Sequence, residues 1–177
     1  MFKGIKDKFK NRSGLKFLKE ELKKPFATVS RRRGISSVAC LVDLDQFENV
    51  NLFYEFVEDF GLRPNAVKII GYKRFYDKNS PYSTPVFSDK DLGWNGTIEN
   101  SYVLEFLSRE YDMLVNYYTE ENLLLQLMSV QTKARVRVGF KEVDAKYNDL
   151  ILDTSIKDFN TFKQELKKYL KVLNELE

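Results

Sequence analysis

Short, continuous apolar runs recur along the chain, and longer segments with helical spacing separate them. The first run is Ser-Val-Ala-Cys-Leu-Val-Asp-Leu at 37–44, and similar runs follow at 67–72, 113–118 and 150–152. A run of this length without alternating polar residues is typical of a strand that is buried on both faces. Such strands need helices on both sides of their sheet, so this pattern constrains the fold more than any other feature of the sequence.

Helical spacing fills the intervals between these runs. Helices are predicted after Asp45 and Thr119, which can act as N-caps, over 99–109, and along a C-terminal stripe within 159–173. The segment 134–140 alternates valine with arginine and predicts a further strand with one wetter face. Because strands alternate with helices, the sequence predicts an α/β fold: a single Rossmann-like three-layer domain with about five mostly parallel strands.

Composition limits the number of domains and the available chemistry. The chain has 177 residues, the size of one ordinary domain, and its 43% hydrophobic content is too high for a disordered protein. Its one cysteine, Cys40, lies in the first apolar run, where we expect a buried thiol. Histidine is absent, which excludes Ser-His-Asp and Cys-His catalysis and His-ligated zinc.

Missing sequence motifs bear on ligands and location. Neither GxGxxG nor GxxxxGK[ST] follows a predicted strand, so we expect no cofactor and no metal ion. The chain has no long uncharged apolar run, and its lysine-rich start differs from a secretory signal. We expect a cytoplasmic protein without a membrane span, peripheral to the ribosome or the inner membrane.

Charge is divided along the chain. Residues 1–33 contain twelve Lys and Arg against three acidic residues, a net charge of +9, whereas residues 34–177 contain 17 against 23, a net charge of −6. This asymmetry indicates that the N-terminal segment meets an anionic surface, with RNA or the ribosome as our first choice and the cytoplasmic face of a membrane as our second. The alternative is a solvated helix that packs on its own acidic domain. The residues expected to bind the anionic surface are Lys3, Lys6, Lys8, Lys10, Arg12, Lys16, Lys19, Lys23, Lys24, Arg31, Arg32 and Arg33.

Apolar residues recur every three or four positions from Phe2 to Leu22, between the lysines. This spacing predicts a basic amphipathic helix, or two short helices broken at Gly14. We assign residues 1–34 to this helix and a linker, and residues 35–177 to the α/β domain.

Polar residues follow several predicted strands at the edge where parallel sheets bind ligands. Asp43, Asp45, Lys73 and Asp153 are the candidates for a catalytic site there, and the two neighbouring aspartates have the ligand type that a divalent cation prefers. The alternative is structural, with Asp45 capping a helix and Asp43 closing a turn.

The connection over 75–97 is unusually long and collects turn-forming residues. Its Ser88, Asp91, Trp94 and Asn95 are candidates for contact with a protein partner. The alternative is again structural: Ser88 and Asp91 form a capping box, and Trp94 covers the sheet edge.

Two resemblances follow from these segments. The sequences YDMLVN at 111–116, LLL at 123–125 and ARVRVGF at 134–140 resemble the N-terminal half of heptosyltransferase-like glycosyltransferases. That resemblance implies a Rossmann-like fold without the activity, because those enzymes need two such halves. Separately, the lysine-rich start, the segment FSDKDLGWNGT at 87–97 and the closing helix resemble an uncharacterised family of small Bacteroidetes proteins.

Two functions remain open on the sequence. The first is a non-catalytic interaction or scaffold protein whose basic helix docks on an anionic surface. The second is a small or degenerate transferase-like enzyme with a carboxylate and lysine site at the sheet edge.

Overall fold

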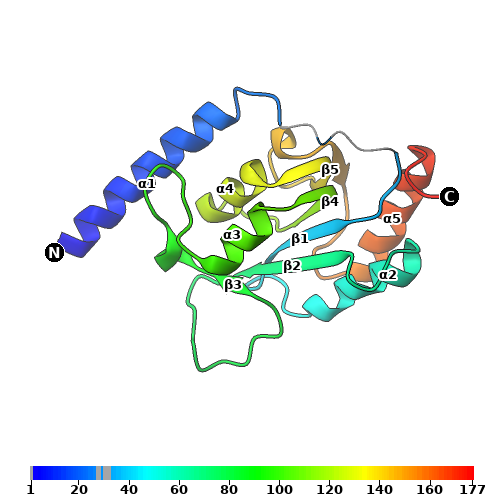
Figure 1. Ribbon diagram of the computed structural model, residues 1–177, viewed down its shortest axis with the longest axis horizontal. Coiled ribbons are helices and arrows are strands. Elements are labelled where there is room, and N and C mark those ends of the chain that lie inside the picture. The colour runs from blue at the N-terminus through cyan, green and yellow to red at the C-terminus, as the bar shows by residue number, and fades with distance from the viewer. Residues whose placement is uncertain (1, 27–28, 30–32) are drawn as a thin grey trace.

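The computed structural model describes residues 2–26, 29 and 33–177. Within this part of the chain, six strands form one parallel sheet in the order β3-β2-β1-β4-β5-β6 (Figure 1). This is the strand order of the doubly wound Rossmann fold, whose winding reverses between β1 and β4. The predicted fold class is confirmed, with one strand more than expected. The strands are β1 (Val38–Asp43), β2 (Val67–Tyr72), β3 (Val86–Phe87), β4 (Glu110–Tyr117), β5 (Lys133–Phe140) and β6 (Leu150–Leu152).

Helices cover both faces of the sheet. One face packs against α3 and α4, with α1 packed against α4, and the other face packs against η1, α2 and α5. Because β1 is buried along its whole length between these layers, the predicted burial of Cys40 is confirmed, and burial raises the pKa of its thiol. The helices are α1 (Phe2–Glu21), α2 (Glu55–Asp59), α3 (Ser101–Leu107), α4 (Leu123–Gln131) and α5 (Phe159–Val172), with 3₁₀ turns η1 (Val50–Tyr54), η2 (Asp89–Asp91) and η3 (Ala145–Tyr147).

Three local predictions differ from the structure. Strand β3 lies in the segment predicted to be a long loop, because a two-residue strand carries no periodicity. Asp45 does not cap a helix, since the chain turns through η1 before α2 begins. Thr119 is not the N-cap of α4 either: the side chain of Asn122 accepts hydrogen bonds from the first turn instead.

The predicted wetter face of β5 was also wrong. Arg137 is 2% exposed, and its guanidinium donates to the carbonyl oxygens of Ser129 and Thr132 at the end of α4. Its Cζ lies 3.9 Å from the centre of the Phe26 ring. A buried arginine is tolerated here because helix-terminal carbonyls and an aromatic face receive its donors and charge.

Helix α1 continues through Gly14, where a break was possible. An added Cβ at Gly14 would lie 3.4 Å from Leu123 and 3.6 Å from Leu127, so the missing side chain lets α1 approach α4 closely. Leu18, one turn further on, is buried in the same core cluster. The second half of α1 therefore belongs to the packed core. The division into residues 1–34 and 35–177 stays a prediction.

A tight hairpin fastens α1 to the domain. Asn95 and Gly96 both have positive φ, at 54° and 75°, and form its turn, while Leu92 and Ile98 pair across its base. The N–H of Asn95 donates to Ser13 Oγ in α1 at 3.1 Å, and the carbonyl of Gly96 accepts from Gln131 of α4 at 3.0 Å. This Asn-Gly turn therefore makes hydrogen bonds to both α1 and α4.

We expect Gly96→Ala to destabilise the protein by about 1–3 kcal/mol. The turn needs a positive φ, and the new Cβ would lie 2.5 Å from the Phe17 ring of α1. The matched control is Gly4→Ala, where nothing lies within 4 Å and helix propensity improves. Urea unfolding of both variants gives the two free energies. Equal stability of the two variants would show that the hairpin does not hold α1.

Candidate functional site

One continuous stripe of exposed residues runs along one side of α1 and into the turn that follows it. Successive members are three or four residues apart, which keeps them on one side of an α-helix. The stripe begins apolar and then becomes cationic. We call it the outer stripe; its members are Phe2, Ile5, Phe9, Arg12, Lys16 and Lys19 of α1, and Lys23 in the turn after α1.

The outer stripe lies opposite the side of α1 that packs on the domain. Phe9 and the buried Leu18 are nine residues apart, which is about two and a half turns and places them on opposite sides. The apolar residues predicted to form one amphipathic face therefore lie on two sides of α1: one side packs on the domain, and the other is exposed. Figure 1 shows the first half of α1 extending beyond the body of the molecule.

The apolar end of the outer stripe is open to solvent. Phe2 is 90% exposed, Ile5 50% and Phe9 52%. Three large apolar side chains on one exposed helical face form the kind of patch that marks an interaction surface. Three of the lysines predicted to bind an anionic surface lie between these apolar residues in the sequence, and a fourth follows Phe9: Lys3, Lys6, Lys8 and Lys10.

The cationic end of the outer stripe lines a groove of about 550 Å³. Its four basic residues are joined there by Lys146 of η3, and Leu15 and Leu22 supply apolar wall. No spacing in the sequence indicates Lys146, because more than a hundred residues separate it from α1 and only the fold brings them together. The groove thus gathers cations from two distant segments.

Few acidic groups neutralise this groove. Glu20 pairs with Lys23 at 2.8 Å, and Asp144 pairs with Lys146 at 3.2 Å. Within the described ranges, no ion pair involves Arg12, Lys16 or Lys19. These three cations are free to meet phosphate groups.

The remaining predicted cations lie apart from the groove or outside the described chain. Lys24 pairs with Glu21 at 2.7 Å, and Arg33 is exposed beyond the end of α1. Arg31 and Arg32 lie outside the described residues.

At the carboxyl edge of the sheet, three of the four predicted catalytic residues come together. Asp43 accepts from the N–H of Asp45 at 3.0 Å, and Asp45 pairs with Lys73 at 3.2 Å. Asp153 follows β6, three strand positions away from β1 or about 14 Å, and pairs with Lys141 at 2.6 Å. The predicted four-residue site is therefore not assembled.

Two residues hydrogen-bond across the crevice between β1 and β4, where doubly wound folds bind ligands. Gln46 donates to Thr119 Oγ1 at 2.7 Å and accepts from the N–H of Thr119 at 2.9 Å. Nowhere in the described chain do three His, Cys, Asp or Glu side chains gather to hold a metal ion. The edge nevertheless contains one strained group, since burial raises the pKa of Asp43 to about 6.

We expect Asp43→Asn to stabilise the protein by about 1–2 kcal/mol at pH 8. The folded protein holds the Asp43 proton more tightly than the unfolded chain, so ionised Asp43 destabilises the fold above pH 6. The gain should vanish as the pH falls towards 4 and the wild-type carboxyl becomes protonated. Urea unfolding across this pH range measures it. Asp45→Asn is the control, because it loses an ion pair and should not stabilise; a pH-independent effect of Asp43→Asn would contradict the assignment.

The long connection uses most of its candidate contact residues internally. The N–H of Ser88 donates to Asp91 Oδ2 at 2.8 Å in the predicted capping box, and Asn95 contacts α1. Trp94 is 44% exposed, so it does not close the sheet edge. Trp94 and Asn95 are both exposed, so these two of the four candidates retain surface for a partner.

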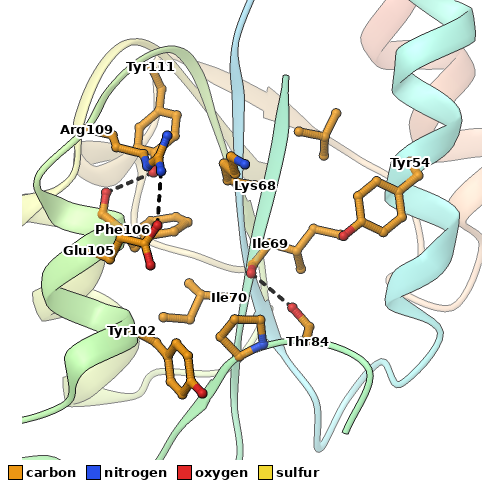
Figure 2. Close-up of a pocket in the computed structure, with 12 residues that line it drawn as sticks. Tyr54, Lys68, Ile69, Ile70, Thr84, Tyr102, Glu105, Phe106, Arg109 and Tyr111 are labelled. Carbon is orange, nitrogen blue, oxygen red and sulfur yellow. Dashed lines mark hydrogen bonds and ion pairs between the residues drawn. The ribbon is translucent and has the colours of Figure 1, made fainter. Parts of the chain in front are cut away.

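A second groove, of about 240 Å³, lies at the outer edge of β2 (Figure 2). Tyr54 stands on one side of the strand, and Tyr102, Glu105 and Arg109 stand on the other. No sequence pattern indicated this groove, because β3 had not been predicted and the edge of the sheet was not defined.

One protein-family model matches most of the chain. The model of a family of unknown function, DUF6913, matches residues 10–173. The chain belongs to the DUF6913 family. This confirms the predicted membership of an uncharacterised family. The DUF6913 match includes the hairpin and the packed half of α1, and begins after Phe9, so the apolar end of the outer stripe lies outside it. No curated protein matches the chain, and no helix of the described chain is long and apolar enough to cross a membrane.

Proposed function

We propose that this protein is a non-catalytic docking protein that binds an anionic membrane surface through the outer stripe of α1. The observation that carries the proposal is the position of Phe2, Ile5 and Phe9, exposed on the side of α1 opposite its packed face and in line with a cationic groove. An interfacial helix needs this combination of inserted apolar side chains and adjacent cations. The helix would lie on the surface while its second half remains fastened to the domain.

The energetics favour a lipid surface. Complete burial of a Phe or Ile side chain contributes about 1.5–3 kcal/mol, and each Lys or Arg near an anionic bilayer contributes about 1 kcal/mol. Insertion of the exposed apolar patch and attraction of the outer-stripe cations together provide stable attachment to the bilayer. Neither set provides it alone.

RNA, which ranked first on charge alone, remains the second candidate. The cationic row from Arg12 to Lys23 and Lys146 suits phosphate contacts, which are independent of nucleotide sequence. The apolar patch favours the membrane over RNA, because a bilayer can bury Ile5 and both phenylalanines, whereas RNA offers only base faces for stacking. Ribosome association is part of this alternative, whereas a cytoplasmic location is proposed with either surface.

The transferase alternative receives less support. Asp43, Asp45 and Lys73 do converge, but Asp153 lies elsewhere and the Gln46–Thr119 pair hydrogen-bonds across the crevice. The resemblance to glycosyltransferases agrees with the fold alone, and a Bacteroidetes origin remains a proposal with it.

The test is co-sedimentation of the full chain with vesicles of phosphatidylcholine containing about one quarter phosphatidylglycerol. We expect binding that falls steeply as salt rises from about 0.1 M to about 0.5 M. The triple variant Phe2→Ser, Ile5→Ser, Phe9→Ser should lose at least about tenfold in affinity, because it removes the inserted groups.

Charge variants test whether vesicle binding depends on the cations of the groove or only on the net charge of the protein. Arg12→Gln, Lys16→Gln, Lys19→Gln should weaken vesicle binding by about tenfold or more. The matched control, which removes three positive charges elsewhere, should lose less than about threefold; it is Lys78→Gln, Lys133→Gln, Lys157→Gln. Equal losses in both sets would contradict the groove. Binding of an RNA hairpin without vesicle binding would favour the second candidate, and binding of neither would refute docking on an anionic surface.

A further inference from the structure

The outer edge of β2 has backbone groups without a neighbouring strand. β3 pairs with Gly71 and Tyr72 only, at the end of β2. The hydrogen bonds between β1 and β2 use Ala66 and Tyr72, which places alternate residues of β2 towards β1 and the others towards the outer edge. By this alternation, the N–H groups of Val67 and Ile69 point outwards, where the described chain places no strand.

The groove in Figure 2 surrounds this open edge. The carbonyl of Ile69 already accepts a hydrogen bond from Thr84 Oγ1 at 3.0 Å, so Thr84 and Pro85 close one end. Tyr54 and Tyr102, 46% and 55% exposed, form walls on the two sides of the sheet. A strand lying along β2 would therefore have an aromatic contact on each face.

The charged side chains that line the groove favour an acidic ligand. Lys68 is partly buried and shares its side of the sheet with Ile70 and α3; within the described chain no ion pair involves it. Arg109 lies on the same side and pairs with Glu105 at 3.0 Å. Two cations against one carboxylate leave one positive charge, which a carboxylate on the incoming strand would neutralise.

We infer that the β2 edge binds an extended polypeptide segment by strand addition, with an acidic side chain of that segment directed to Lys68. The unpaired N–H groups of Val67 and Ile69 would recognise the backbone of the segment, and the tyrosine walls would contact its alternate side chains. This inference goes beyond the proposed membrane docking and does not depend on it. It supplies the second surface that a docking protein needs to bring a partner to the membrane.

A second copy of this chain fits the edge less well. Lys68 lies at the centre of the open stretch between Val67 and Ile69, so an antiparallel pairing of two β2 edges would oppose Lys68 with its own copy. Like charges directly opposite each other destabilise a pair of strands. The charge on the groove thus selects a different, acidic segment.

The test uses amide NMR spectra of the full chain titrated with the blocked peptide acetyl-Thr-Val-Glu-Val-Thr-amide, and with the same peptide carrying Lys in place of Glu. We expect millimolar binding, shifts at the Val67 and Ile69 amides, and at least about threefold preference for the Glu peptide. Lys68→Glu should reverse that preference. The control Lys133→Glu, which changes the same charge at the exposed start of β5, should leave it unchanged.

Tyr102→Ala is a second variant, on the exposed face of α3, and should weaken both peptides by about threefold or more through loss of an aromatic wall. An absence of shifts at about 10 mM peptide would overturn the inference. So would shifts confined to other residues, or a preference that Lys68→Glu leaves unchanged. Light scattering gives the oligomeric state of the protein without peptide. If it shows a dimer in which the Val67 and Ile69 amides are already protected from exchange, the β2 edge self-associates and the inference is overturned.

Discussion

The close packing of α1 against α4 at Gly14 determines what the rest of the molecule can do. A glycine at that point lets the second half of the helix join the core, and the Asn95-Gly96 hairpin holds it there. Once this inner side is fixed, the geometry of an α-helix directs Phe9 and Arg12 to the opposite side. The exposed apolar patch therefore results from a rigid attachment to the domain.

We propose that the doubly wound sheet is a scaffold for two surfaces. Gln46 and Thr119 hydrogen-bond across the crevice at its switch point, and burial raises the pKa of the Asp43 carboxyl to about 6. The outer stripe of α1 and the open edge of β2 instead present chemistry outwards. The first suits an anionic bilayer, and the second suits an extended acidic segment.

The sequence predicted those parts of the fold that depend on local pattern. The runs at 67–72 and 150–152 became β2 and β6 with the same bounds. The run at 67–72 is largely buried, as an apolar run of strand length predicts, whereas Ile151 of the edge strand β6 is exposed. Strand β3 gave no such signal at two residues. The same limit applies to the sites: Lys146 joins the cationic groove, and Lys68 the β2 groove, through tertiary contacts that no spacing in the sequence encodes.

The most direct test of membrane docking compares nitroxide labels on the two sides of α1. Buried Cys40 allows single labels at Phe9→Cys and Asn11→Cys, two residues and about 200° apart around the helix. On anionic vesicles, power saturation should place the label at position 9 below the lipid phosphates and leave the label at position 11 in water. Both labels in water on sedimented vesicles, or both at the same depth, would contradict the account.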